Sequence, residues 1–546
     1  MENKRLKLPI GIQTFEKLRR GGYVYVDKTK YLVDLIEQGE IYFFARPRRF
    51  GKSLTVTTLD ALFSGKKELF QGLYAEEFMN RPEFKPSPVI RLDMTKTTTD
   101  CGIDEFKKSV VKQVRDIATR LDVTLSDSVS PGSLFDDLIA QLSTKHQQKV
   151  VILIDEYDAP YTEFVNDPEM ANKIRSVLRN FYVRIKNNDE YIRFTFITGI
   201  SKFAKFGVFS ALNTPNDISL SPKYAEICGY SEDEIIKYFP EYLDDTANYM
   251  NISTGELIEK MRYYYNGFSF DSGAKARLYN PYSTLRFLDL MEFLNYWIDT
   301  GKPKFIADYL KNRKLTVEQF RNLPISRDFA QSPGDVDTAT PEGFLYQCGY
   351  LTLRPGIGGN LSLDYPNTEV LNSMSALLAQ NILQAKGENY NYFTNRILIA
   401  IIRDDYGLFV ETLNALLASI PYDDFASAAK ENVLIQGYKF PAQEWLYRST
   451  ILAFLRGCGV VVVAEMHTNA GRADLIVSHN GKTWVIELKV ACEGESPAKK
   501  AEEAIRQIID KNYAKPYPDA VCIGMAIDDS QRQITNYELI TLNAEL

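Results

Sequence analysis

Residues 149–156 read Lys-Val-Val-Ile-Leu-Ile-Asp-Glu, an apolar run that ends in two acids. Its length and its β-branched residues predict a strand that is buried on both faces. Comparable runs stand at 41–45, 88–92 and 192–197, and amphipathic stretches of helical length separate them. Strands that alternate with helices, too far apart for hairpins, favour a parallel sheet with helices on both faces. We therefore expect an α/β domain over residues 1–225.

A phosphate-binding loop is predicted where the first of these strands ends. Residues 45–53 read Ala-Arg-Pro-Arg-Arg-Phe-Gly-Lys-Ser and open a helical stretch. Backbone N–H groups at such a helix start would hold phosphate oxygens, with Lys52 reaching the β- and γ-phosphates and Ser53 ligating Mg²⁺. Arg46 stands where the full motif has glycine, so the turn is built differently. The predicted ATP-binding residues are Arg46, Arg48, Arg49, Phe50, Gly51, Lys52, Ser53 and Asp155.

Two acids follow the strand at 149–154, on the sheet edge where the loop is expected. Asp155 would meet the Mg²⁺ held by Ser53, and Glu156 would polarise the attacking water as a catalytic residue. Taken alone, an Asp-Glu pair is an ordinary strand exit, and the loop arginines are an ordinary solvated group. The loop and the acids together predict binding and hydrolysis of ATP with Mg²⁺.

The rest of the chain is expected to hold three further domains. Residues 226–290 are helical in pattern and rich in tyrosine, which suggests a helical lid. Residues 291–430 are expected to be a helical and winged-helix-like region, because a helix, a hairpin around 356–360 and a second helix follow one another. Residues 431–546 change rhythm to helix, three strands, helix and strand, which predicts a separate α/β domain.

Residues 471–489 read Gly-Arg-Ala-Asp-Leu-Ile-Val-Ser-His-Asn-Gly-Lys-Thr-Trp-Val-Ile-Glu-Leu-Lys. Asn-Gly between alternating strands predicts a hairpin with a two-residue type I′ turn. Counting back from that turn places Asp474 directly opposite Glu487, with Lys489 on the same side. Cβ atoms in such a pair are about 5 Å apart, where like charges repel.

Two facing carboxylates need a cation or a proton between them. Oxygen ligands favour Mg²⁺ or Mn²⁺, so Asp474 and Glu487 are predicted metal ligands. Such a metal can activate water while Lys489 neutralises developing charge. Without a metal the pair repels, so Asp474→Asn should be neutral or mildly stabilising. The alternative is a solvated charged face, on which the acids pair with Arg472 and Lys489.

The pattern Asp474…Glu487-Leu-Lys489 resembles the PD-(D/E)xK nuclease signature, although Arg-Ala precedes the aspartate in place of proline. Glu444, on the helix before the hairpin, and Gln507, on the helix after it, match that family's acid and glutamine. The resemblance implies a restriction-endonuclease-like domain whose catalytic residues are Glu444, Asp474, Glu487, Lys489 and Gln507. The segments FFARPRRFGKS, LIDEYDAP and YNPYSTL resemble the AAA-ATPase-like domain fused to such nucleases in bacteria, so the likeness covers nearly the whole chain.

Composition limits the partners and the compartment. The 546 residues carry 64 Lys+Arg against 71 Asp+Glu, a net charge of −7, so nucleic acid must be held by a local patch. The sequence shows no secretory signal and no apolar run of about 18 residues, so we expect a cytoplasmic protein without a membrane partner. The three histidines are too few for a multi-histidine zinc site, and the six scattered cysteines are typical of reduced core residues.

The expected function is that of an ATP-binding protein, an ATPase that controls a Mg²⁺-dependent nuclease acting on nucleic acid, with DNA favoured. The family resemblance associates it with bacterial defence or mobile-element biology. The alternative is a nucleotide-switched scaffold that binds DNA or a partner through an inactive nuclease-like domain. An excess of acidic over basic residues from 431 onward favours this alternative. The phosphate-binding loop suits a homo-oligomer and a monomer equally.

Overall fold

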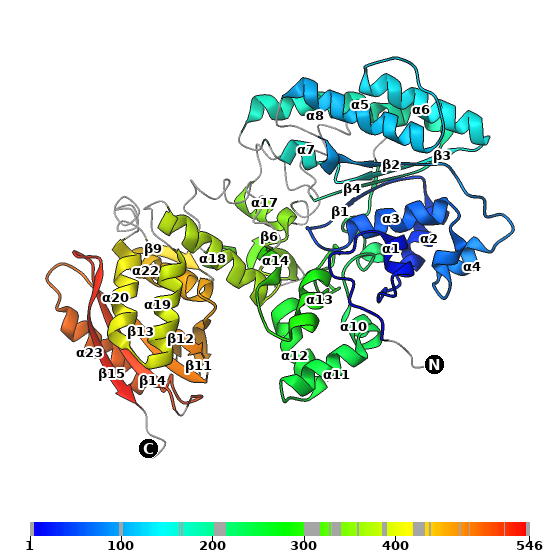
Figure 1. Cartoon of the computed structure of the whole chain (residues 1–546). Coiled ribbons are helices and arrows are strands. Elements are labelled where there is room, and N and C mark those ends of the chain that lie inside the picture. The colour runs from blue at the N-terminus through cyan, green and yellow to red at the C-terminus, as the bar shows by residue number, and fades with distance from the viewer. Residues whose placement is uncertain are drawn as a thin grey trace. The chain divides into compact units, whose positions relative to one another are not determined.

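The structure is a computed structural model, shown as a cartoon in Figure 1. Contacts divide the chain into two compact units. The first holds Met1–Tyr309 and Phe320–Val370, and the second holds Leu310–Gln319 and Leu371–Leu546. The described residues are 5–97, 102–162, 164, 167–200, 215–299, 317–326, 329, 340–356, 360–384, 390–418, 432–435, 438–468, 471–479, 481–517 and 519–541.

The first unit contains a parallel five-stranded sheet with the strand order β2-β3-β4-β1-β5. Strand β3 is buried along its whole length because its apolar side chains point into both covering layers. Helices α5, α6 and α8 cover one face, and α1 to α4 lie on the other (Figure 1). This arrangement confirms the predicted α/β architecture. The strands are β1 (Ile41–Ala45), β2 (Val89–Asp93), β3 (Val150–Asp155), β4 (Ile192–Gly199) and β5 (Asn216–Asp217).

The helices around this sheet follow their apolar periodicity. Helix α5 buries Phe106, Val110, Val114 and Ile117, which are spaced three or four residues apart and therefore form one stripe. The helices of this α/β part are α1 (Phe15–Arg20), α2 (Thr29–Gln38), α3 (Lys52–Phe63), α4 (Ala75–Met79), α5 (Ile103–Arg120), α6 (Pro131–His146), α7 (Ala159–Thr162) and α8 (Pro168–Asn187).

A helical group follows the sheet in the same unit. Helix α10 begins with a capping box in which Ser231 and Glu234 satisfy each other's backbone N–H groups. Phe239, Leu257 and Tyr265 form a common core with Val24 and Val26 from the N-terminal segment. The group comprises α10 (Glu232–Tyr238), α11 (Pro240–Tyr249), α12 (Thr254–Tyr265), α13 (Pro281–Leu290) and α14 (Tyr296–Asp299).

A helix, a hairpin and a second helix complete the first unit, in the predicted order. The hairpin is confirmed, because β7 and β8 pair in antiparallel fashion from Thr352–Asp364 to Pro355–Leu361. Its tip at 357–359 lies outside the described residues. The last helix begins in the first unit and ends in the second. The elements are β6 (Leu323–Ile325), α17 (Pro341–Cys348), β7 (Thr352–Pro355), β8 (Leu361–Asp364) and α18 (Thr368–Gln384).

The second unit is built on a mixed sheet with the order β11-β12-β13-β14-β15, in which only β13 and β14 run parallel. Strand β15 was not anticipated from the sequence. The strands are β11 (Val461–Thr468), β12 (Gly471–His479), β13 (Lys482–Ala491), β14 (Val521–Asp528) and β15 (Gln533–Thr541). A separate pair joins β9 (Asn432–Ile435) and β10 (Tyr438–Pro441).

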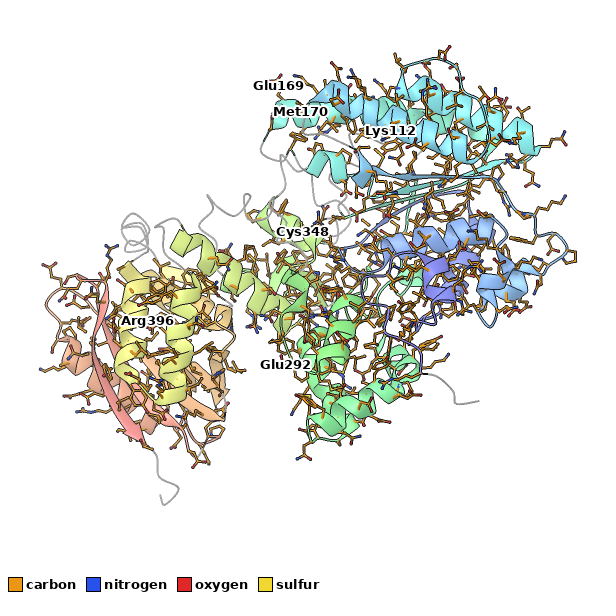
Figure 2. All side chains as sticks on the ribbon, in the orientation of Figure 1. Lys112, Glu169, Met170, Glu292, Cys348 and Arg396 are labelled. Atoms are coloured by element: carbon orange, nitrogen blue, oxygen red, sulfur yellow. The ribbon has the colours of Figure 1, made fainter. Side chains whose placement is uncertain are left out.

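Helices cover both faces of this sheet. Leu475, Trp484 and Ile486 share one core with α19, α20 and α22, whereas Ile476 and Val485 are buried under α23. Both faces of the β12–β13 hairpin are therefore covered by helices. Helices α19 and α20 pack side by side in this unit, and Arg396 of α19 (Figure 2) donates to Thr412 of α20. The helices are α19 (Tyr390–Arg403), α20 (Tyr406–Ala418), α22 (Ala442–Gly457) and α23 (Pro497–Asp510).

Within the described part of the chain, no helix combines the length and the apolar character that a membrane crossing requires. The compact unit that contains the C-terminal sheet begins near Leu371, and α19 and α20 belong to its core. The finer division into four domains at 225, 290 and 430 remains a proposal.

Candidate functional site

The loop between β1 and α3 is where the sequence predicts a phosphate-binding loop. Gly51 has φ +101° and Arg49 has φ +69°, so the chain takes two left-handed steps just before the helix starts. Lys52 is 4% exposed, and its Nζ donates to the carbonyl oxygens of Arg46 (3.0 Å) and Pro47 (3.2 Å). The ammonium group therefore lies inside the curve of the loop, at the N-terminus of α3, where phosphate groups are bound in such loops.

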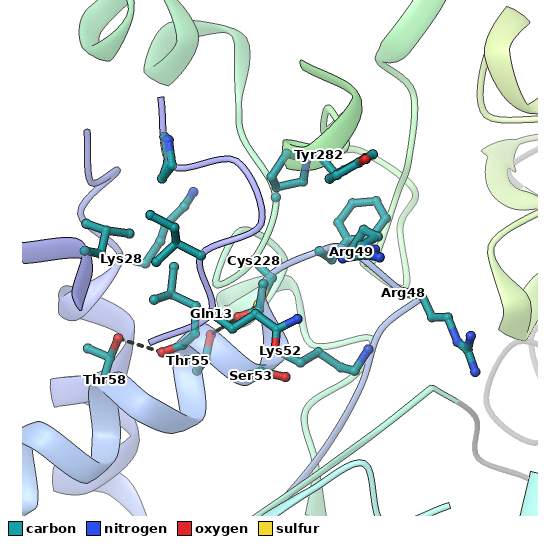
Figure 3. A pocket seen from close by; sticks show the side chains of 18 of the residues that line it. Gln13, Lys28, Arg48, Arg49, Lys52, Ser53, Thr55, Thr58, Cys228 and Tyr282 are labelled. Atoms are coloured by element: carbon teal, nitrogen blue, oxygen red, sulfur yellow. Dashed lines mark hydrogen bonds between the residues drawn. The ribbon is translucent and has the colours of Figure 1, made fainter. Parts of the chain in front are cut away.

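A cavity of about 490 Å³ opens beside this loop. This volume falls within the usual range for small-molecule sites. Figure 3 shows Lys52 and Ser53 at the start of the helix, with Thr55 next to Cys228. The walls are polar at the loop and apolar beyond it, where they include Val24, Leu32, Ile227 and Leu285.

Arg46, predicted to bind ATP, is not part of the cavity wall. It is 1% exposed, and its guanidinium donates to the carbonyl oxygens of Ser219 (2.6 Å) and Tyr224 (3.3 Å). The group also lies between the rings of Phe44 and Phe270, and burial lowers the pKa of Arg46 to about 10. Arg46, which stands where the full motif has glycine, therefore connects the loop to the segment around 219–224 through hydrogen bonds.

The other predicted loop residues line the cavity. Arg49 lies over the ring of Tyr282 at 5.1 Å, whereas Arg48 extends away from Ser53 (Figure 3). Phe50 packs edge-on against Phe268 and Phe270, at 4.8 and 5.0 Å. Only the two arginines and Lys52 thus bring positive charge to the cavity from this loop.

The two acids after β3 lie at the same edge of the sheet and have different environments. Asp155 is buried, and its Oδ1 accepts a 2.6 Å hydrogen bond from Thr198 at the end of β4. Glu156 lines the cavity and has φ +50°, an uncommon value for a non-glycine residue. Burial raises the pKa of Glu156, whereas the nearby charge of Lys52 lowers it. Glu156 thus lines the same cavity as Lys52 and has an uncommon backbone conformation.

In the second unit, the predicted hairpin register is confirmed. Leu475 pairs with Ile486, Val477 with Trp484, and His479 with Lys482. Asn480 lies outside the described residues, and Gly481 has φ +78°, as a type I′ turn requires. The strand pairing between β12 and β13 ends at Leu475, one residue before the predicted Asp474–Glu487 pair.

The two carboxylates interlock where that pairing ends. The backbone N–H of Asp474 donates to Glu487 Oε2 at 3.2 Å, and the N–H of Leu488 donates to Asp474 Oδ2 at 2.9 Å. Each side chain therefore occupies a place that a strand-to-strand hydrogen bond would fill. The predicted proximity of the acids holds, but through side-chain to backbone contacts.

The remaining predicted residues surround these two acids. Glu487 Oε1 accepts hydrogen bonds from Gln507 and, at 3.4 Å, from Lys489. Burial and then the charge of Asp474 raise the pKa of Glu444, on α22, so the two carboxylates are close enough to interact electrostatically. The structure thus brings together all five residues taken from the nuclease resemblance.

Asp474 and Glu487 are both buried, and this affects their ionisation. Asp474 is 8% exposed and Glu487 is 2% exposed, which excludes the alternative of a solvated charged face for these two acids. Burial raises the pKa of Glu487, and the neighbouring Asp474 raises it further. Two buried carboxylates that disfavour joint ionisation are a donor set suited to a divalent cation.

The number of side chains that could ligate a metal at this site is small. Among the described residues, no group of three or more His, Cys, Asp or Glu side chains is placed to hold a metal ion. Mg²⁺ is commonly held by one or two carboxylates and keeps several waters, so Asp474 and Glu487 fit such a cation. Glu444 stands outside this pair.

Arg448 is the site residue that sequence reasoning missed. It is 6% exposed, and its Nη1 lies 3.3 Å from Asp474 Oδ1. It follows Glu444 by four residues on α22, so both side chains share one face of the helix. The spacing of four residues between Glu444 and Arg448 was the sequence signal that could have indicated that Arg448 lies at the site.

The Arg448–Asp474 pair reverses the expected effect of Asp474→Asn. Asparagine would remove the negative charge that faces the buried guanidinium at 3.3 Å, and breaking a buried pair typically costs about 3–5 kcal/mol. We expect a loss of about 2 kcal/mol in the free energy of unfolding, because Glu444 stays near Arg448. Urea unfolding of Asp474→Asn, Arg448→Met and the double variant measures this coupling. Additive losses in the double variant would mean that the pair does not interact.

Two families match this chain. One, described as Predicted AAA-ATPase, matches residues 9–209, and the PD-(D/E)XK nuclease superfamily matches residues 442–537. A protein of Azotobacter chroococcum mcd 1, described as an uncharacterized protein in the vnfD 5′ region, is 32% identical over 528 residues. That alignment covers 94% of each of the two chains. The chain belongs to the family in which an AAA-ATPase-like domain precedes a PD-(D/E)XK nuclease superfamily domain.

Membership suggests an enzyme with ATPase and nuclease activity. The N-terminal parallel sheet is consistent with a P-loop domain, and the C-terminal mixed sheet is consistent with a nuclease fold. Domains of these types use ATP and a divalent metal, and a nuclease domain implies a nucleic-acid substrate.

Proposed function

We propose that this protein hydrolyses ATP in its first unit and thereby controls a metal-dependent nuclease in its second unit. The observation that carries the nuclease assignment is the interlocked pair of Asp474 and Glu487, with Lys489 and Gln507 bonded to Glu487. Buried carboxylates whose pKa is raised by burial and by a like charge are typical of functional sites, and this supports the proposal.

In the ATPase site, the residues divide the work by position. Lys52 and the N–H groups at the start of α3 bind the β- and γ-phosphates. Ser53 and Asp155 would hold Mg²⁺, and the hydroxyl of Thr198 keeps the Asp155 carboxylate oriented through its 2.6 Å bond. Glu156 is directed into the cavity and acts as the base that orients the attacking water. The apolar wall at Val24 and Leu32 suits the adenine ring.

In the nuclease site, Asp474 and Glu487 would hold Mg²⁺ or Mn²⁺. When bound, such a cation stabilises charge on the phosphate and makes water a better nucleophile. Gln507 keeps Glu487 oriented through its hydrogen bond to Oε1. The side chain of Lys489 is 25% exposed, compared with 2% for Glu487, so its ammonium group is available to the phosphodiester of a nucleic acid. DNA is the favoured substrate.

A packed route inside the first unit supports control by nucleotide. A Cβ on Gly349, at the end of α17, would lie 2.6 Å from Pro47 Cβ, so the phosphate loop touches the helix that bears Cys348 (Figure 2). Thr352 Oγ1 accepts a hydrogen bond from the N–H of Ser269. Ser269 follows Phe268, whose ring packs against Phe50. The helix–hairpin module therefore packs on the loop, and α18 continues from that module into the second unit.

Gly349→Ala is expected to weaken ATP binding about tenfold. Gly349 has φ +85°, where alanine costs about 1–2 kcal/mol, and the added methyl would displace Pro47 in the phosphate loop. Gly255→Ala is the matched control, because a Cβ at Gly255 in α12 meets nothing within 4 Å. Fluorescent-nucleotide titration of both variants gives the comparison. Wild-type affinity in Gly349→Ala would remove this contact from the proposed route.

The proposed function is tested by a nuclease assay on the full chain. Duplex plasmid, single-stranded DNA and RNA are offered with and without ATP and with Mg²⁺, Mn²⁺ or EDTA. We expect cleavage of DNA that requires the divalent metal and that changes at least severalfold when ATP is added. Cleavage that ignores ATP would contradict the proposed control, and no cleavage under any condition would contradict the nuclease.

One observation favours a second candidate, a nucleotide-switched scaffold with an inactive nuclease-like domain. All four carboxylate oxygens of Asp474 and Glu487 accept contacts from the protein itself, through Arg448, Lys489, Gln507 and two backbone N–H groups. A scaffold would bind DNA or a partner in an ATP-dependent way without cleaving it. Size-exclusion chromatography with and without ATP, run beside the nuclease assay, separates the two functions and gives the oligomeric state.

A further inference from the structure

Arg448 is a deeply buried cation inside the candidate nuclease site. Its side chain is 8% exposed, against 25% for Lys489, the other cation bonded to the acid pair. Lys489 contacts Glu487, whereas Arg448 contacts Asp474. Each of the two interlocked acids therefore has its own positive partner, one near solvent and one in the interior.

Arg448 faces the oxygen of Asp474 that a metal ion would also use. Asp474 Oδ2 is bound by the N–H of Leu488, which leaves Oδ1 as the oxygen that Arg448 faces at 3.3 Å. This distance is longer than the roughly 2.7–2.9 Å of a strong charge-assisted hydrogen bond. The guanidinium thus neutralises Asp474 without forming a close bidentate pair.

The position of Arg448 implies repulsion with any metal at the site. A divalent cation held by Asp474 would be repelled by the guanidinium, which faces the same carboxylate at 3.3 Å, and Coulomb repulsion grows with the product of the two charges. Burial weakens solvent screening, so this repulsion exceeds the small gain from orienting one carboxylate. Charge and burial together therefore oppose metal binding.

We propose that Arg448 is an internal counter-ion that competes with the divalent cation for Asp474. It keeps the carboxylates together when no metal is bound, and it raises the metal concentration at which the site fills. This proposal rests on the proposed nuclease function, since it takes Asp474 and Glu487 as the metal-binding pair. Arg448 is a positioning residue, and Lys489 remains the residue that meets the substrate.

The test measures Mn²⁺ binding to the full chain without ATP, from the electron paramagnetic resonance signal of free Mn²⁺. Arg448→Met removes the charge but keeps most of the aliphatic volume, and we expect it to bind Mn²⁺ about tenfold more tightly than the wild type. Arg448→Lys keeps the charge and should bind with nearly wild-type affinity. Arg456→Met is the matched control, since it removes another buried arginine of α22, which donates to the carbonyl of Val462.

The outcomes are distinct. A purely structural role for Arg448 predicts that Arg448→Met binds Mn²⁺ with unchanged or weaker affinity, and either result overturns the proposal. If wild type and Glu487→Ala bind equally, the metal site itself fails, and the proposed nuclease function fails with it. Should Arg448→Met not fold, Arg448→Gln takes its place, with the same expected tightening. Melting temperatures with and without Mn²⁺ give a second readout, because the metal-induced rise should be larger in Arg448→Met.

Discussion

Lys52→Ala should reduce ATP affinity by about 100-fold or more and bring ATP hydrolysis to background. The ammonium group is buried inside the phosphate loop, 3.0 Å from the carbonyl of Arg46, and Glu156 lies close enough to feel its charge. Loss of a buried, charge-assisted contact to phosphate removes about 3 kcal/mol, and each 1.4 kcal/mol is a factor of ten in affinity. Fluorescent-nucleotide titration and phosphate release measure the two effects.

A suitable control for this variant is Lys260→Ala. Lys260 lies on α12 in the same unit, is half-exposed and pairs only at the surface with Glu256. It should leave ATP binding and hydrolysis unchanged. If Lys52→Ala hydrolyses ATP at the wild-type rate, the phosphate-loop assignment is wrong, whatever the nuclease does. If nucleotide controls the nuclease, cleavage by Lys52→Ala should no longer respond to ATP.

Individual strands and the hairpin could be predicted from the sequence because their local sequence signals are strong. The run 149–154 has no polar residue after its first lysine, so it has one stable environment, the interior of a parallel sheet. Asn-Gly between alternating strands predicts a two-residue turn and with it the register, which the pairs Leu475–Ile486 and Val477–Trp484 confirm. Such features need no knowledge of distant segments.

Features that depend on distant partners were not predictable in the same way. Arg46 resembled a phosphate ligand, but its guanidinium binds backbone carbonyls near 219 and 224, more than 170 residues away. Helices α19 and α20 were assigned to the middle of the chain, because nothing local shows that their apolar faces belong to the core of Trp484. A sequence motif names residue types, whereas burial and partners decide which of them reach a ligand.

The hairpin shows where register reasoning stops. Counting from the turn placed Asp474 opposite Glu487, and the acids do lie together. The count could not show that the strand pairing ends at that point and that each carboxylate takes a backbone N–H instead. The repulsion between the acids follows from the count, but the buried Arg448 that faces Asp474 does not, and this partner is why Asp474→Asn is expected to destabilise the fold.

Glu487→Ala should end cleavage, with a loss of about 1,000-fold or more, and should also abolish the metal response of the second unit. Glu487 is 2% exposed and accepts hydrogen bonds from Gln507, Lys489 and the N–H of Asp474, so its carboxylate is held in place beside Asp474. A lost metal ligand removes several kcal/mol of charge stabilisation at the phosphate, at about 1.4 kcal/mol per factor of ten.

Stability provides the independent readout for this variant. The wild-type melting temperature should rise as Mn²⁺ is added without ATP, because the metal binds the folded state, whereas Glu487→Ala should stay nearly unmoved. Glu411→Ala removes an exposed carboxylate of α20 that pairs with Arg396, and it should retain both the cleavage and the thermal shift. Loss of cleavage with a wild-type thermal shift would place the metal elsewhere. Retained cleavage in Glu487→Ala would exclude this pair as the catalytic centre, because the proposed site requires the Glu487 carboxylate as a metal ligand.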